Sequence, residues 1–289
     1  MTDSGDRKHH YYDYYGDRSE AEADVARTSR SCAKIARDEE PHRHLDSLAS
    51  IAESWAWWLT PLGDRKLRRA LDLWGEALVG HFRMACAEPG DQLTVTLGGK
   101  PVAAIGKGPD STSHAGRWGD AFLICAISRN HRGLDELCRV PEAVFGGSVV
   151  NGRERFSTDE WVVHLARALR AMWTRSEQAG DHLVAALEAT DPGRTNFGEF
   201  ESRVLDLEVP LMELMLRLLE RDERAFNEAY DKALGLHRRY FTIPERLHDP
   251  EGFLAIRPLS MACLAHDIGM HIERDSPYAP LWLIQEAEE

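Results

Sequence analysis

Histidine is the side chain in this sequence best suited to acid–base chemistry, and of the 13 histidines the candidates are His164, His237 and His266, which lie in predicted helices with half-apolar surroundings. An imidazole exchanges a proton near neutral pH, so with a nearby carboxylate each of them can act as a general acid or base. A lone histidine on such a helix face is more often a hydrogen-bonded structural residue. We therefore predict no catalytic residue, and an enzyme that uses these histidines stays the last alternative.

The sequence lacks the spacings that metal and phosphate sites require. His266 and His271 are five residues apart, about 140° around a helix, whereas two metal ligands on one helix face need a spacing of four. Gly106-Lys107 is followed by Gly108 rather than by Ser or Thr, so this segment does not match a phosphate-binding loop. The five cysteines form no Cys-x-x-Cys pair, which indicates neither a zinc ribbon nor a disulfide framework. We predict no metal and no cofactor.

The chain is acidic, and its charge is unevenly distributed. The 289 residues include 35 lysines and arginines against 48 aspartates and glutamates, a formal net charge of −13. Residues 181–289 hold 22 of the acids and 11 of the bases, whereas residues 45–180 are balanced. This charge argues against nucleic acid as a partner. An acidic region of this kind either attracts a basic partner or keeps the protein soluble.

No apolar run in the sequence is long enough to cross a membrane. The longest, such as 121–127 and 211–219, fall short of the 18 or more residues that a span requires. The start of the chain is polar and rich in tyrosine, without the apolar core of a signal peptide. We therefore expect a cytoplasmic protein that makes no membrane contact, with residues 1–18 as a flexible tail.

Helical periodicity dominates the rest of the chain. Leu67, Leu71 and Trp74 recur at intervals of three to four residues and mark one helix face, as Trp161 and Leu165 do in another segment. The pattern predicts about ten helices, over residues 19–37, 42–59, 64–87, 114–129, 132–139, 158–176, 178–189, 199–220 (interrupted by Pro210), 223–241 and 258–268.

A weak internal similarity suggests how these helices pack. Arg129-Asn130 and Arg221-Asp222 each follow the end of one amphipathic helix and precede the start of another. Both patterns are typical of antiparallel helix pairs. We therefore predict an all-α fold of stacked helix pairs in a solenoid-like array over residues 19–289, with one long concave binding surface.

One segment departs from the helical pattern. Leu93, Val95 and Leu97 alternate with threonines before Gly98-Gly99, and a second apolar run reaches residue 105. This pattern predicts a β-hairpin over residues 92–105. Pro101 has no amide proton to donate, which confines its strand to an edge. The hairpin is therefore expected to be a small attachment to a helical body.

Several sequence motifs follow one another in a fixed order from about residue 114 to residue 282. They are Ala115–Phe122, Ile127–Asn130 with Leu137–Pro141, Glu160-Trp161 with Trp173, Phe226–Ala229 with His237 and Tyr240, Gly252–Ala255 with Pro258-Leu259 and Cys263–Ala265, and Asp275–Tyr278. In order and spacing this stretch resembles the immunity protein 49 family. The resemblance implies a bacterial protein, encoded beside a polymorphic toxin, that binds the toxin inside the producing cell and blocks it. It implies no enzyme.

The acidic half of the chain supplies candidate contacts with such a toxin. Carboxylates at helix ends or turns are available to steer association and to pair with a basic toxin surface, for example that of a nuclease. These candidates are Glu199, Glu201, Glu208, Asp222 and Glu223. A general α-solenoid adaptor for another protein partner fits the same periodicity and remains the main alternative.

Five residues that match the family pattern are interpreted as structural, because a scaffold persists while a toxin-specific surface varies. They are Trp118, Asp120, Arg129, Trp161 and Pro258. Asp120 and Arg129 are nine residues apart on one predicted helix, so any ion pair that either forms is expected to involve another helix.

Overall fold

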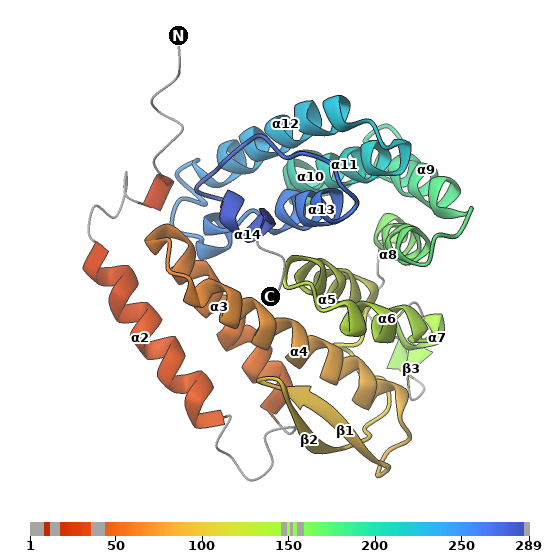
Figure 1. The fold of residues 1–289 in the computed structure, drawn as a ribbon. Helices are drawn as coiled ribbons and strands as arrows, with labels where there is room; N and C mark the ends of the chain where they lie inside the picture. Colours follow the sequence, from red (N-terminus) through yellow and green to blue (C-terminus); the bar gives the residue numbers. More distant parts are fainter. Residues whose placement is uncertain are drawn as a thin grey trace.

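The computed structural model describes residues 9–11, 18–35, 44–145, 149–150, 153–154 and 159–285. Within these ranges the chain is mostly helical, and its helices pack in pairs (Figure 1). It also has one hairpin whose two strands have six residues each. These features confirm the predicted fold class. The helices are α2 (Arg18–Ile35), α3 (Leu45–Leu62), α4 (Lys66–Cys86), α5 (Ala115–Ile127), α6 (His131–Arg139), α7 (Glu142–Phe145), α8 (Glu160–Trp173), α9 (Ala179–Ala189), α10 (Glu201–Arg203), α11 (Val209–Glu220), α12 (Glu223–Phe241), α13 (Ile256–Asp267) and α14 (Leu281–Gln285), with shorter helical turns η3 (Gly198–Phe200), η4 (Val204–Glu208) and η5 (Pro250–Phe253).

Nine of the ten predicted helices begin and end within three residues of their predicted bounds. Their apolar stripes are buried, as in α4, where Leu67, Leu71 and Trp74 face the core. None of the described helices combines the length and the apolar character that crossing a membrane requires.

Helix α5 joins the two sides of the molecule. The N-terminal helices α2–α4 lie on one side and helices α9–α13 on the other, with α5 between them (Figure 1). One face of α5 packs against α4 and another against α13. As a result, the largest cluster of buried apolar residues is continuous from Cys32 in α2 to Ile284 in α14.

The two similar sequence motifs form the same local structure. Arg129 and Arg221 both end a helix in the left-handed region, with φ of 52° and 56°. Each is followed by a residue that caps the next helix: the Asn130 side chain accepts a hydrogen bond from the Gly133 amide, and that of Asp222 accepts one from Ala225. A side-chain oxygen that satisfies a free amide favours a helix start at that point. These turns connect α5 to α6 and α11 to α12.

The predicted hairpin is present. Strands β1 (Gln92–Leu97) and β2 (Lys100–Ile105) pair antiparallel, with Leu97 opposite Lys100. Gly98 and Gly99 form the turn at φ of 59° and 72°, a conformation that glycine adopts without steric cost. The hairpin packs against α4 through β1.

The eighth predicted helix, residues 199–220, is divided into η3, α10, η4 and α11. The η4 segment is π-helical, and the Val209 amide donates to the carbonyl of Val204, five residues earlier. Pro210 follows directly and has no amide proton for an α-helical bond. The wider π-helical turn places the missing backbone hydrogen bond at Pro210. This accounts for the division of the predicted helix.

Short elements escape sequence periodicity. Helices α7 and α14, the turn η5, and a second hairpin of β3 (Val149–Val150) and β4 (Arg153–Glu154) were not predicted. Each has five residues or fewer, which is too short for a helical or alternating pattern to emerge.

The prediction of a flexible tail over residues 1–18 is wrong for His9, His10 and Tyr11. All three are at most 2% exposed. The His9 ring nitrogen Nε2 lies 2.8 Å from the carbonyl oxygen of Phe253, and the Tyr11 ring meets that of Phe253 edge to face at 5.3 Å. An aromatic segment becomes buried when distant parts of the chain provide an apolar site, and composition alone does not reveal that site. Residues 1–8 and 12–17 of the predicted tail lie outside the described residues.

Candidate functional site

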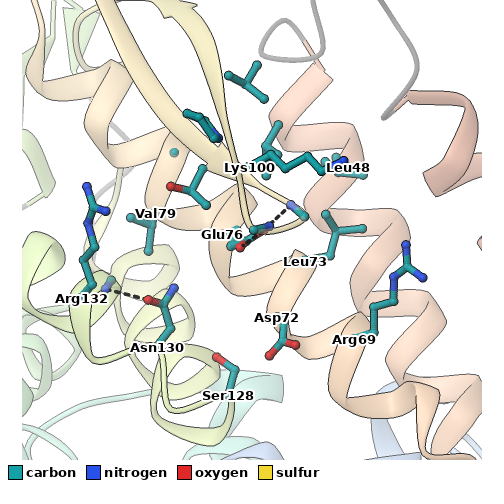
Figure 2. Close-up of a pocket in the computed structure, with 18 of the residues that line it drawn as sticks. Leu48, Arg69, Asp72, Leu73, Glu76, Val79, Lys100, Ser128, Asn130 and Arg132 are labelled. Carbon is teal, nitrogen blue, oxygen red and sulfur yellow. Dashed lines mark hydrogen bonds between the residues drawn. The ribbon is translucent and has the colours of Figure 1, made fainter. Parts of the chain in front are cut away.

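A groove of about 1110 Å³ lies over one face of α4. Residues spaced three or four apart on this helix, from Arg69 through Glu76 to Arg83, line it. Helices α2 and α3 border one side, and the turn between α5 and α6 borders the other (Figure 2). The turn of the first hairpin contributes residues 96–102. We call this concavity the α4 groove.

The charge of the α4 groove is opposite to that of the whole chain. Five of its lining residues are basic and three are acidic, although the chain carries a net charge of −13. The basic residues are Arg69, Arg83, Lys100, Arg129 and Arg132, and the acidic residues are Asp72, Glu76 and Glu136.

All three acidic residues interact with other groups of the protein, and for Glu76 and Glu136 the partners belong to the groove. The Glu76 carboxylate accepts hydrogen bonds from the backbone amides of Gly98 and Gly99, at 2.9 Å for Gly99 (Figure 2). Burial raises the pKa of Glu76, and these amides oppose the rise. Glu136 pairs with two arginines, Arg132 at 3.0 Å and Arg83 at 3.4 Å. These contacts fix the hairpin turn and α6 relative to α4.

Arg69 and Lys100 differ from the other basic residues of the groove. Both are exposed, and neither forms an ion pair with any residue that the structure describes. Arg69 belongs to α4 and Lys100 to β2, and Figure 2 labels both residues. Sequence reasoning missed both. For Arg69 the available signal was the polar stripe of α4, opposite its predicted apolar stripe; Lys100, in β2, had no such signal.

Arg129 borders the groove but its guanidinium is directed into the protein. It is 7% exposed, and its Nη1 donates to the carbonyl of Leu283 at 2.7 Å and lies 3.0 Å from Sγ of Cys263. Nη2 donates to the carbonyl of Ile284 and lies 3.3 Å from Asp267. Arg129 therefore joins the end of α5 to α13 and α14. Its ion pair is with another helix, as the sequence analysis expected.

A second set of charged residues lies where α10, η4, η5 and α13 meet, with Glu208 buried and the others half-buried. Arg257 makes two bonds to the Glu208 carboxylate, at 2.7 and 2.9 Å, and Arg203 makes two to Glu251, one of them 3.1 Å long. Arg257 also lies 3.7 Å from Glu251, which links the two pairs. We call these four residues the inner cluster. The sequence analysis placed Glu208 on a toxin-facing surface, but this residue is only 7% exposed and is bound by Arg257. The π-helical turn before Pro210 ends at Glu208, so helix-end position did not imply exposure.

Two further carboxyl groups lie beside the inner cluster, and neither forms an ion pair with an arginine in the part of the chain that the structure describes. Burial raises the pKa of Glu53 in α3 to about 8, and the charges of Asp120 and Glu251 add to this rise. Asp120 in α5 is exposed, and partial desolvation by the neighbouring protein, with the charges of Glu208 and Glu251, raises its pKa to about 6. At pH 7 the Glu53 carboxyl is therefore mostly neutral, whereas the Asp120 carboxyl is mostly ionised.

The other four predicted toxin contacts are exposed. Glu199 and Glu201 flank Phe200, whereas Asp222 and Glu223 lie at the start of α12. A nearly continuous helical segment separates the two pairs, and at 1.5 Å per residue it places them about 30 Å apart. Asp222 caps α12, and the Glu223 carboxylate accepts the His271 amide at 2.9 Å. The structure therefore does not gather the predicted contacts into one patch.

The three candidate acid–base histidines do not line the α4 groove. His237 is buried and its Nε2 lies 3.0 Å from the carbonyl of Gly252, and burial lowers its pKa to about 4. His164 pairs with Glu160 at 3.5 Å along α8, and His266 lies 3.7 Å from Asp267. The three histidines therefore have different partners and do not form one site. Among the described residues, no three or more His, Cys, Asp or Glu side chains are arranged to hold a metal ion.

The remaining residues interpreted as structural lie in or against the core. Trp118 is fully buried, its Nε1 donates to the carbonyl of Leu137 at 3.0 Å, and its ring stacks on Phe145. Pro258 is buried in the first turn of α13, and Trp161 packs against the main core from α8.

Comparison with known proteins gives one match. The model of a family described as immunity protein 49 matches residues 63–283. No curated protein and no solved structure matches the chain. The matched range begins earlier than the resemblance noted in the sequence, which ran from about residue 114, and therefore includes α4 and the hairpin of the α4 groove. Helices α2 and α3, which border the groove on one side, lie outside it.

Proposed function

Because this chain belongs to the immunity protein 49 family, we propose that it binds a toxin of a polymorphic toxin system in the cytoplasm of the producing cell and blocks that toxin's activity. The family match over residues 63–283 is the observation that carries this proposal. Inhibition by binding requires a complementary surface and no catalytic group.

The charge of the chain favours a toxin with a basic surface, such as a nuclease that binds nucleic acid. A net charge of −13 with most of the surplus in residues 181–289 attracts such a surface over roughly a Debye length, about 8–10 Å at ordinary salt. The exposed carboxylates of Glu199, Glu201, Asp222 and Glu223 are the proposed contacts. Complementary charge of this kind acts mainly on the association rate.

Both acidic ends also offer apolar surface. Phe200, between Glu199 and Glu201, is 61% exposed, and the end at Asp222 and Glu223 has two exposed apolar side chains. Ile268 at the end of α13 is 49% exposed and Leu219 at the end of α11 is 38% exposed. The bond between Glu223 and the His271 amide places the start of α12 beside the segment that follows α13. Apolar side chains surrounded by charge are typical of protein interfaces. We infer that the end at Asp222 and Glu223 contributes more to toxin affinity, because exposed apolar side chains from two elements adjoin its carboxylates, whereas Phe200 alone does so at Glu199 and Glu201 among the residues that the structure describes.

Co-purification from the native cell tests the proposal. An affinity-tagged full-length chain is expected to recover a protein that stops growth when expressed alone and permits growth when expressed together with this chain. Recovery of non-toxic proteins only would favour the α-solenoid adaptor. Growth arrest that persists in the presence of this chain would reject toxin neutralisation.

Two matched variants then compare the acidic ends. Asp222→Asn with Glu223→Gln removes two charges and keeps a side chain that can cap α12, and Glu199→Gln with Glu201→Gln removes two charges at the other end. We expect the first variant to slow association with the recovered toxin about fivefold at low salt and the second to slow it less than twofold. Equal association rates for both variants and the wild type would remove these carboxylates from the interface.

A further inference from the structure

The α4 groove has no role in the proposal so far, and its charge does not suit a basic toxin surface. We propose that the groove receives an acidic segment of the toxin. This inference rests on the proposed function and adds a second contact of opposite sign to the one at Asp222 and Glu223.

The first argument is the balance of charge within the groove. Glu76 is held by two backbone amides, and Glu136 is shared by Arg83 and Arg132. Arg69 and Lys100 are exposed and form no ion pair with the described part of the chain. When Asp72 is counted and the inward-directed Arg129 is left out, four cationic side chains line the groove against three carboxylates, a formal surplus of one positive charge. An incoming carboxylate gains both charge pairing and hydrogen bonds from these side chains.

The second argument is the size of the groove. Sites for small molecules are usually about 300–1,000 Å³ and enclose their ligand, whereas this groove reaches about 1110 Å³ and is bordered by exposed residues such as Gly99 and Arg132. An open groove of this size suits a length of polypeptide better than a metabolite. Peptide segments that lie in such grooves use charged residues for orientation and backbone groups for affinity.

The lining also argues against nucleic acid. Proteins that bind single strands combine a strongly basic path with exposed aromatic rings on which bases stack. Trp55 is the one Trp, Tyr or Phe residue among those that line the groove, and it is only 5% exposed. Carboxylates that extend from flexible side chains need no stacking surface. The observations therefore favour an acidic polypeptide.

The third argument is continuity with the acidic end. Arg129 and His131 at the edge of the groove approach Asp267 at 3.3 and 4.0 Å. Exposed Ile268 follows Asp267 directly, and His271 is bonded to Glu223. The basic groove, the apolar residue and the acidic end thus lie along one edge of the molecule. A toxin with an acidic segment beside a basic face is complementary to both, and this pairing of signs fixes its orientation.

Charge reversal in the groove tests the inference. Arg69→Glu with Lys100→Glu is compared with Arg194→Glu plus Arg239→Glu, which changes the net charge equally at exposed sites outside the groove. Binding of the toxin recovered by wild-type protein is measured by calorimetry. We expect the groove variant to weaken binding at least tenfold and the control variant less than twofold. Equal effects of the two variants, or none, would overturn the proposal.

A photo-crosslinking amino acid at position 100 identifies the segment itself. The expected product joins position 100 to an acidic stretch of the toxin. A crosslink to a basic or apolar stretch, no crosslink in the intact complex, or competition by a 20-nucleotide RNA with binding at the groove would overturn the inference.

Failure of the proposed function and failure of the groove inference can be told apart. Failure of the wild-type chain to recover or neutralise a toxin rejects the proposed function alone. In that case the groove is probed with a fluorescent peptide of ten glutamates. Binding by the wild type and the control variant, but not by the groove variant, supports an acidic ligand. The absence of binding by the wild type overturns it.

Discussion

Charged residues of the inner cluster and of the α4 groove have different surroundings and different partners. Inside, Arg257 and Arg203 each make two bonds to a carboxylate. In the groove, exposed Arg69 and Lys100 form no ion pair with any described residue. A charge that leaves water requires a partner, whereas an exposed charge does not. Pairing inside therefore reflects the requirements of folding, and a charge left over in a groove remains available to another molecule.

The largest effect on folding is expected at Arg129, whose backbone borders the groove but whose guanidinium belongs to the interior. Arg129→Met would leave the carbonyls of Leu283 and Ile284 without their donor and remove the pair with Asp267. We expect a loss of about 4 kcal/mol in the free energy of unfolding, measured by urea denaturation. A loss below 1 kcal/mol would place Arg129 with the groove residues rather than with the interior.

The inner cluster itself is tested at Glu208. Glu208→Gln keeps the size of the side chain but leaves the buried guanidinium of Arg257 without its closest negative charge. We expect unfolding to become easier by about 3 kcal/mol, with the affinity of the folded protein for its toxin unchanged in calorimetry. Loss of toxin affinity in a protein that remains fully folded would restore Glu208 as a contact residue and contradict its assignment to the interior.

Sequence patterns predicted the parts of this molecule that depend on neighbours along the chain. The stripe from Leu67 to Trp74 and the alternation in β1 need only local periodicity, and both gave the correct element. The position of Glu208 depends on Arg257, 49 residues later, and the burial of His9 depends on Phe253, 244 residues later. Local patterns do not encode such distant pairing, so the inner cluster and the buried N-terminal segment were not predicted.

The α4 groove was missed for a related reason. It is formed by segments as far apart as α2, the hairpin turn and the turn after α5, and its charge differs from that of the chain as a whole. The net charge of −13 therefore predicted the sign of the average surface and not the sign of this concavity. The family resemblance indicated a toxin as the class of partner. A buried family residue such as Trp118 does not show which surface of this protein contacts the toxin.

Glu53 extends the comparison because it is a half-buried carboxyl that forms no ion pair with an arginine among the described residues. Its pKa is raised by burial from 4.5 to about 8, with Asp120 and Glu251 adding to the rise and Arg117 opposing it. The folded protein thus binds this proton more tightly than the unfolded chain, so the stability it contributes below pH 4.5 is lost as pH rises towards 8.

Removal of that titration is expected to flatten the pH profile of stability. Glu53→Gln should lose less stability than the wild type between pH 5 and pH 8, and should exceed the wild type by about 2 kcal/mol at pH 8. Denaturation curves at both values of pH measure the difference. Parallel profiles for the two proteins would mean that Glu53 is ionised in the folded state near neutral pH, as a fully hydrated carboxylate is.

Glu76 combines features of both regions, since it lines the groove but its carboxylate is used by the fold. Glu76→Gln retains one acceptor oxygen for the two amides of Gly98 and Gly99. Because these amides can also bind water, we expect a loss of only about 1 kcal/mol. Faster hydrogen exchange at Gly98 and Gly99, without change in α4, would show that the carboxylate fixes the hairpin turn. Unchanged exchange would show that the turn holds its position without it.

The smallest effect on folding is expected for the groove residues proposed to contact the toxin. Arg69→Met with Lys100→Met removes two exposed charges that have no ion-pair partner in the described chain, and such surface changes usually alter stability by less than about 0.5 kcal/mol. Thermal and urea denaturation of this variant should match the wild type. A loss as large as that of Arg129→Met would mean that these side chains also serve the fold, and the distinction between paired interior charge and available groove charge would then fail. Unchanged stability together with weakened toxin binding is the combination that an interface residue produces and a structural residue does not.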